Sequence, residues 1–335
     1  MNRLKAILLV LVLVAVAVPS AAQGQDYPLY FCEGGAFSTE EDFMTGVETY
    51  DGLPYISDGD LLSLDGRLCA RSEDLLRQLD IRPGHNMGLD AVDILDFDHL
   101  LVAFSTELDS PHRSMTFTHG DVLLTTGAII PNSALTYLFD HCHKDAGLDA
   151  VQFVGDPERI LEFANSINFV DPHESLDGGQ LQGMLEDFNI DIWFSTESTL
   201  SPCDSSVLEA ADAGLVALDG DVLSARFGLI VYRQDRLFDD IIPAGIPERG
   251  VDFGLDAFQL MEWFEDVEVL PELVEAGEML PAYFSTEILY RGRGEFTDGD
   301  VLEVFGNVVI ENAELVEPFA PVVDFLGLDA LWLPR

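Results

Sequence analysis

The sequence predicts a mainly β protein with short helices, built from four repeated units. Three short motifs recur four times in one fixed order along the 335 residues. Short apolar runs that suit strands lie beside these motifs, and glycines that suit turns separate the runs. Self-similarity of this kind is typical of repeat folds, in which each unit completes its core against its neighbours.

The first motif is Phe-Ser-Thr-Glu, the second is Gly-Asp followed by Val or Leu and then Leu, and the third is Gly-Leu-Asp-Ala. The first begins at residues 37, 104, 194 and 284, the second at 59, 120, 220 and 299, and the third at 88, 147, 254 and 327. The second-motif and third-motif aspartates are 30, 28, 35 and 29 residues apart. This segment is therefore a near-constant unit.

Residue types predict the order of elements within one unit. An apolar run such as 100–104 forms a strand that ends at the first motif. Gly-Asp then makes a turn, because glycine tolerates positive φ and aspartate closes an Asx turn. Two further strands follow, as at 301–304 and 308–310, and then an amphipathic helical turn, as at 312–319. The third motif leads into another strand, as at 331–333. Longer helices are expected in insertions near 157–169 and 270–279.

The positions of the ends suggest how the units assemble. The chain begins its repeats inside a unit and stops five residues after the last third motif. Residues 327–335 are therefore expected to supply the strand that the first unit lacks, which would remove exposed sheet edges. We predict a four-bladed β-propeller over residues 23–335, with units at about 23–87, 88–146, 147–253 and 254–326, closed by 327–335. The alternative is an open or irregular β-repeat array.

Charge and the first residues predict where the protein works. The chain has 61 acidic and 16 basic residues and a net charge of −45, which excludes nucleic-acid binding through a basic surface. Residues 1–22 resemble a secretory signal peptide, with Arg3 and Lys5, an apolar run at 6–18, and small residues up to Ala22. That run is short for a membrane anchor. We expect export to the periplasm or medium, and no membrane partner after signal removal.

Four cysteines, Cys32, Cys69, Cys142 and Cys203, suggest two disulfides in an exported chain. Three pairings are possible, and Cys32–Cys69 with Cys142–Cys203 gives the shortest loops. A metal site at His141-Cys142-His143 is the competing interpretation, but we find no second ligand pair at a suitable spacing.

The three motifs together resemble those of bacterial exported repeat proteins of undefined function. The Asp-Ala entry into a strand, with an apolar strand ending in Phe, is also similar to hemopexin-type four-bladed propellers. That resemblance implies a central channel faced by Asp90, Asp149, Asp256 and Asp329, where carbonyls or side chains can hold ions. The present repeats are longer, and no cysteine after Cys203 can join the first and last units.

The repeated acids have two interpretations. They bond backbone amides within turns or between units, or they bind calcium, which takes six to eight oxygen ligands. Two carboxylates flank a glycine in Asp58-Gly59-Asp60, Asp219-Gly220-Asp221 and Asp298-Gly299-Asp300, which suggests one ion per unit. In the second unit His119 replaces the first aspartate, so that Asp121 stands alone. Calcium is the only cofactor expected.

No familiar catalytic motif is present, including a Gly-x-Ser-x-Gly elbow, His-Glu-x-x-His or a phosphate-binding loop. The motifs that stand out recur in all four units, whereas catalysis usually needs residues that are present in one unit only. The sequence therefore favours a non-catalytic exported module, stabilised by calcium, that has a structural role or binds a protein, a glycan or an ion. The alternative is an exported hydrolase of glycans or esters, with its site in the channel mouth or in a cleft built by the insertions at 155–190 and 258–282.

Overall fold

The computed structural model describes residues 27–82, 84–111, 117–139, 145–167, 176–200, 216–238, 253–291, 295–323 and 325–335. The expected signal peptide, the Cys142–Cys203 pair and His141-Cys142-His143 lie outside these ranges. The Cys32–Cys69 disulfide is confirmed, with the two Cα atoms 5.9 Å apart. No helix within the described ranges combines the length and the apolar character needed to cross a bilayer.

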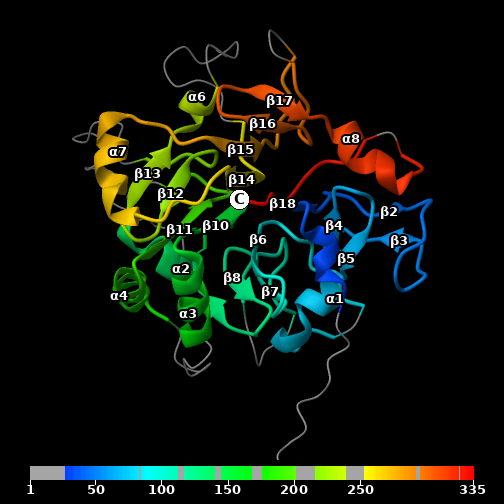
Figure 1. Cartoon of the computed structure of the whole chain (residues 1–335), viewed down its shortest axis with the longest axis horizontal. Coiled ribbons are helices and arrows are strands. Elements are labelled where there is room, and N and C mark those ends of the chain that lie inside the picture. Colours follow the sequence, from blue (N-terminus) through cyan, green and yellow to red (C-terminus); the bar gives the residue numbers. More distant parts are fainter. Residues whose placement is uncertain are drawn as a thin grey trace, which may run out of the picture.

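Four sheets of four antiparallel strands make up most of the fold (Figure 1). The first has the order β18 (Leu331–Trp332), β1 (Ala36–Phe37), β4 (Leu61–Ser63) and β5 (Leu68–Ala70). The second contains β6 (Val92–Asp96), β7 (Leu101–Phe104), β8 (Val122–Leu124) and β9 (Ile129–Ile130). The third contains β10 (Ala150–Gly155), β11 (Ile190–Ser195), β12 (Val222–Ser224) and β13 (Leu229–Tyr232). The fourth contains β14 (Ala257–Leu260), β15 (Ala282–Ser285), β16 (Val301–Glu303) and β17 (Asn307–Ile310).

Each motif has the same place in every sheet. The third motif leads into the first strand of a sheet, and the second strand ends at the phenylalanine or the serine of the first motif. The Gly-Asp of the second motif precedes the third strand, and the last two residues of that motif begin the strand. The four motif phenylalanines are at most 1 % exposed, and they are Phe37, Phe104, Phe194 and Phe284. The three motifs therefore occupy equivalent positions in four similar sheets.

The first sheet combines strands from distant parts of the chain. Its first strand, β18, pairs antiparallel with β1, so that Trp332 lies opposite Ala36 and Leu331 opposite Phe37. In the other three sheets the strands follow one another along the chain. The hydrogen bonds of β18 therefore tie residues 331–332 to residues 36–37.

The prediction of a mainly β protein with short helices is confirmed, but that of a closed four-bladed propeller is wrong. The described strands form five separate sheets of two to four strands, and none is closed or curled into a barrel or propeller. The fifth sheet pairs β2 (Phe43–Met44) with β3 (Tyr55–Ile56). The strand β18 completes the first sheet alone, and every described sheet keeps two edge strands, so backbone pairing does not join the sheets into one closed structure. Neighbouring sheets meet by packing.

The first strands lie side by side at the middle of the molecule (Figure 1). Strand β6 contacts β10 and β18, and β14 also contacts β10 and β18. Apolar side chains from the sheets and helices form four buried clusters, which include Trp193, Phe153 and Phe319. The residues that precede the first strands are thereby brought close together.

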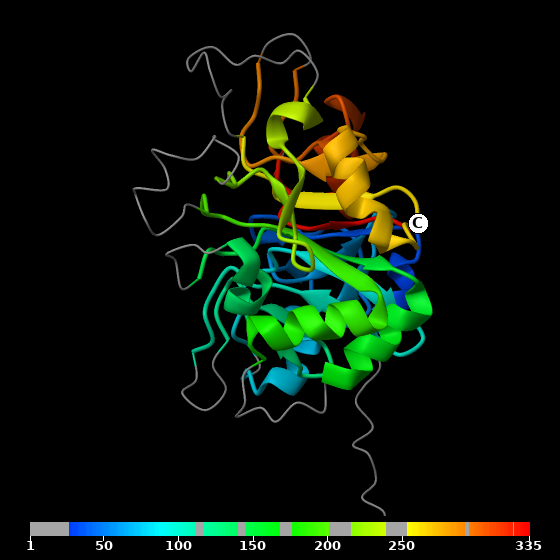
Figure 2. The ribbon, with the colours of Figure 1, turned by 90° about the vertical axis from the view of Figure 1, so that its left-hand side faces the viewer.

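Helices occur in two kinds of place. A short helix follows the last strand of each four-stranded sheet: α1 (Ser72–Leu75), α2 (Asn132–Leu135), α6 (Gln234–Leu237) and α8 (Asn312–Val316). The predicted insertions hold α3 (Pro157–Ile167), α4 (Gly178–Phe188) and α7 (Leu270–Ala276). Helices α3 and α4 pack against each other on the third unit (Figure 2). Short 3₁₀ turns lie at Leu29–Cys32, Arg77–Leu79, Tyr137–Phe139, Val267–Val269 and Glu317–Phe319.

Candidate functional site

The second-motif aspartates hold the turn before the third strand against the start of the short helix. In Asp121, Oδ2 accepts a hydrogen bond from the Thr118 amide at 2.9 Å and Oδ1 accepts one from the Asn132 amide at 2.7 Å. The same two bonds recur at the equivalent residues, which are Asp60, Asp221 and Asp300. Because both oxygens serve backbone amides, this geometry favours the structural interpretation of these four aspartates.

The residue two positions before each second-motif aspartate does not make the same hydrogen bonds in every unit. The Asp58 carboxylate accepts a hydrogen bond from the Asn86 side chain. The Asp219 carboxylate accepts one from the Gly220 amide at 2.9 Å. Oδ1 of Asp298 is buried and has no hydrogen-bond partner among the described residues. The paired carboxylates on either side of each glycine therefore differ in their bonding, since the second of each pair is engaged with backbone.

Three of the four motif serines join one sheet to the next, whereas Ser285 Oγ is buried and has no hydrogen-bond partner among the described residues. Ser38 Oγ donates to the Leu89 carbonyl at 2.9 Å, and Ser105 Oγ donates to the Leu148 carbonyl at 3.0 Å. Ser195 Oγ likewise donates to the Leu255 carbonyl at 3.3 Å. Each acceptor is the leucine of a third motif in the following sheet. These bonds help to fix the positions of the neighbouring aspartates, Asp90, Asp149 and Asp256.

The motif glutamates lie over the third-motif glycines. A Cβ at Gly147 would lie 2.3 Å from Cδ of Glu197, and one at Gly88 would lie 2.4 Å from Cδ of Glu107. The same close approach joins Gly254 to Glu287 and Gly327 to Glu40. Only a residue without a side chain leaves room for the carboxylate. The repeated glycine therefore brings each glutamate toward the aspartate two residues beyond it.

Four aspartates and four glutamates thus lie near one another beside the first strands, where their charges influence each other. We call this group the acidic ring, and its members are Asp90, Asp149, Asp256, Asp329, Glu40, Glu107, Glu197 and Glu287. Oδ2 of each aspartate is buried and has no hydrogen-bond partner among the described residues. Asp149 is 5 % exposed and Asp256 is 7 % exposed. A buried carboxylate oxygen of this kind needs a partner such as a hydrogen-bond donor, a proton or a cation.

The surroundings of the acidic ring favour its neutral form in the absence of a cation. Burial, with the nearby charges of Asp90, Glu107 and Glu40, raises the pKa of Asp329 to about 9. Burial and neighbouring carboxylates also raise the pKa values of Glu40 and Glu107 to about 7. The pKa values of Asp90, Asp149 and Asp256 are raised well above the usual range, chiefly by burial. A bound cation would replace the protons that these groups otherwise hold.

The closest approach within the ring is between three of its members. One carboxylate oxygen from each of Asp90, Asp149 and Glu197 lies within 4.8 Å of the others. Among the described residues, no other group of three or more potential ligands meets this criterion. Asp90 and Asp149, which come from neighbouring units, therefore lie close to each other and to Glu197.

A second polar group at the centre did not follow from the sequence. Arg335 donates to Asp93 Oδ1 at 2.6 Å and to the Phe153 carbonyl at 2.9 Å, and its guanidinium lies 4.4 Å from the centroid of the Trp263 ring. Both side chains of the ion pair are at most 3 % exposed. The sequence did contain a signal for this polar group. A polar residue lies two positions after the third-motif alanine in three units, at Asp93, Gln152 and Gln259.

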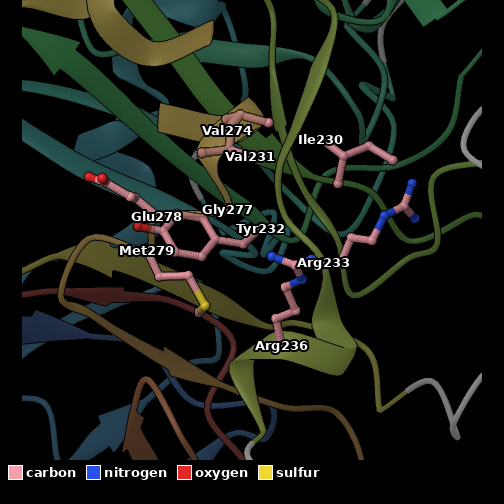
Figure 3. A pocket seen from close by; sticks show the side chains of 9 residues that line it. All are labelled: Ile230, Val231, Tyr232, Arg233, Arg236, Val274, Gly277, Glu278 and Met279. Carbon is pink, nitrogen blue, oxygen red and sulfur yellow. The ribbon is translucent and has the colours of Figure 1, made fainter. Parts of the chain in front are cut away.

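The cleft beside the second insertion holds a surface pocket (Figure 3). Its walls come from β13, α6 and α7 with the segment that follows α7, and the lining residues are Ile230, Val231, Tyr232, Arg233, Arg236, Val274, Gly277, Glu278 and Met279. Glu278 is the single carboxylate among them, whereas glycosidases use a pair. The described lining of this pocket therefore lacks the pair of carboxylates that glycosidases use.

Comparison with known proteins adds no assignment. No family model matches this chain, and neither the curated proteins nor the solved structures contain a match.

Proposed function

We propose that this protein is an exported, non-catalytic binding or structural module whose fold is stabilised by a divalent cation held in the acidic ring. The observation that carries the proposal is the set of buried, unpartnered carboxylate oxygens at the acidic ring. Calcium is the cation that we propose, because it accepts several carboxylate oxygens in irregular geometry. Magnesium keeps more of its water and is less suited to a crowded carboxylate site.

The physical role of the cation follows from electrostatics. When ionised, eight carboxylates at one place repel each other, and burial makes each charge more costly, so without a cation they take up protons. The ring lies where the four sheets meet, so relief of this repulsion stabilises the contacts between sheets. A cation that binds the folded chain alone raises the stability of the fold by mass action.

Thermal melting of the mature chain after exhaustive chelation tests this proposal. Calcium at about one hundred times its dissociation constant should stabilise the fold by about 2.7 kcal/mol. For a chain of this size we expect a rise in melting temperature of about 4 °C. Magnesium at the same concentration should have a smaller effect.

A matched pair of variants locates the effect. Asp149→Asn removes one buried ligand and should abolish most of the calcium-dependent rise. Asp187→Asn makes the same change on the exposed face of α4 and should leave the rise intact. Equal melting temperatures with and without calcium in the parent protein would remove the proposal.

A further inference from the structure

The four units give the acidic ring equivalent residues, but the carboxylates do not approach each other equally. One carboxylate oxygen from each of Asp90, Asp149 and Glu197 lies within 4.8 Å of the other two. No other three potential ligands among the described residues lie as close together. Two oxygens that share one calcium ion, each at about 2.4 Å from it, lie at most ~4.8 Å apart. The geometry for shared coordination is therefore present at one place in the described part of the ring.

This place lies at the junction of the second and third sheets. Asp90 precedes β6, Asp149 precedes β10, and Glu197 follows β11. The serine bond from Ser105 to the Leu148 carbonyl fixes this junction next to Asp149. Asp149 is 5 % exposed, and its Oδ2 has no hydrogen-bond partner among the described residues. A deeply buried, unpartnered oxygen within the cluster points to a ligand that the cluster itself does not supply.

The sequence departs from its repeat at the same junction. His119 stands where the other units have Asp58, Asp219 and Asp298. Its Nδ1 lies 3.0 Å from Asp109 Oδ1, and its Nε2 lies 3.9 Å from Glu197 Oε1. An aspartate at this position would repel Glu197, whereas the imidazole does not. In the second unit, the neighbour of Glu197 is therefore a histidine, His119, in place of the aspartate found at this position in the other units.

We infer that the chain binds a single calcium ion away from the centre of the acidic ring, with Asp90, Asp149 and Glu197 as its protein ligands. The remaining members of the ring contribute charge and no direct bond. This inference rests on the proposed function and adds the number of ions and their ligands. It replaces the expectation of one ion per unit with one ion per chain.

Calorimetric titration of the chelated mature chain with calcium chloride tests the inference, and native mass spectrometry gives the number of ions. We expect one ion per chain. Glu197→Gln should weaken calcium binding at least tenfold. Glu40→Gln, the same change at the equivalent position of the first sheet, should weaken it less than threefold. Melting of both variants in chelator shows that each one is folded before the titration is interpreted.

The outcomes separate the two proposals. No calcium binding by the parent protein overturns the proposed function itself. One bound ion with equal losses in the two variants places the ion at the centre of the ring, and four bound ions place one in each unit. Either of these results overturns the present inference and leaves the proposed function standing.

Discussion

Gly147 illustrates how a single residue sets the geometry of the acidic ring. Its φ is +73°, and a Cβ placed on it would lie 2.3 Å from Cδ of Glu197. The positive φ is unfavourable for any residue with a side chain, and the contact leaves no space for one. The glycine of the third motif is therefore needed both for the backbone turn and for the position of the glutamate.

The substitution Gly147→Ala tests this requirement. We expect a loss of about 1–2 kcal/mol from the left-handed backbone alone, and a further loss because the Glu197 carboxylate must move. Gly183→Ala is the matched control, since Gly183 lies in α4 with no atom near the added Cβ. Alanine should stabilise that helix by about 1 kcal/mol. Urea denaturation of both variants gives the comparison, and equal effects would contradict the argument.

At the scale of elements, β18 is held by more than its strand pairing. The strand is two residues long, and Arg335 extends beyond it to form the buried ion pair with Asp93 of β6. Burial raises the pKa of Asp93, and the Arg335 charge opposes this shift. The pair therefore links the segment after β18 to the second sheet, at a point where the described residues make no backbone hydrogen bond between the two sheets.

Removal of one partner should be costly, because a buried charge is then left alone. Arg335→Ala should lower the free energy of unfolding by about 3–5 kcal/mol. Arg67→Ala is the matched control, because the Arg67–Asp65 pair is half exposed and is expected to contribute about 0–1 kcal/mol. The double variant Asp93→Asn with Arg335→Ala should recover part of the loss. Chemical denaturation measures all three, and a loss in Arg335→Ala no larger than in the control would contradict this role.

At the scale of the whole molecule, the raised pKa values make stability depend on pH. In the absence of calcium, Glu40 and Glu107 titrate near 7 and Asp329 near 9 in the folded chain. The unfolded chain holds these protons less tightly, so the folded chain binds more protons between about pH 5 and 9. Stability should therefore rise as the pH falls through this range.

Melting temperatures measured in chelator from pH 9 to pH 5 check this direction. We expect a rise of several degrees on acidification, and a smaller rise in saturating calcium because the cation has already displaced the protons. A constant ionic strength keeps screening of the large net charge equal across the series. A fall in melting temperature over this range in chelator would show that other groups dominate.

Much of the fold could be predicted because it is local and repeated. The motif phenylalanines, the turn aspartates and the Cys32–Cys69 disulfide followed from residue type and spacing. The assembly of the sheets did not, since the repeat describes one sheet and says little about packing between sheets. The Asp93–Arg335 pair joins residues that are 242 positions apart, and no periodic pattern reports such a contact. The close approach of Asp90, Asp149 and Glu197 depends on the same packing.

The pairing of β18 with β1 has a consequence for the order in which the chain acquires its structure. During synthesis the second, third and fourth sheets can each be completed from a continuous stretch of polypeptide. The first sheet has its other three strands early, but it waits for residues 331–332, which are synthesised after the strands of all the other sheets. Until then β1 presents an open edge, so a nascent chain depends on residues 331–332 to protect residues 36–37.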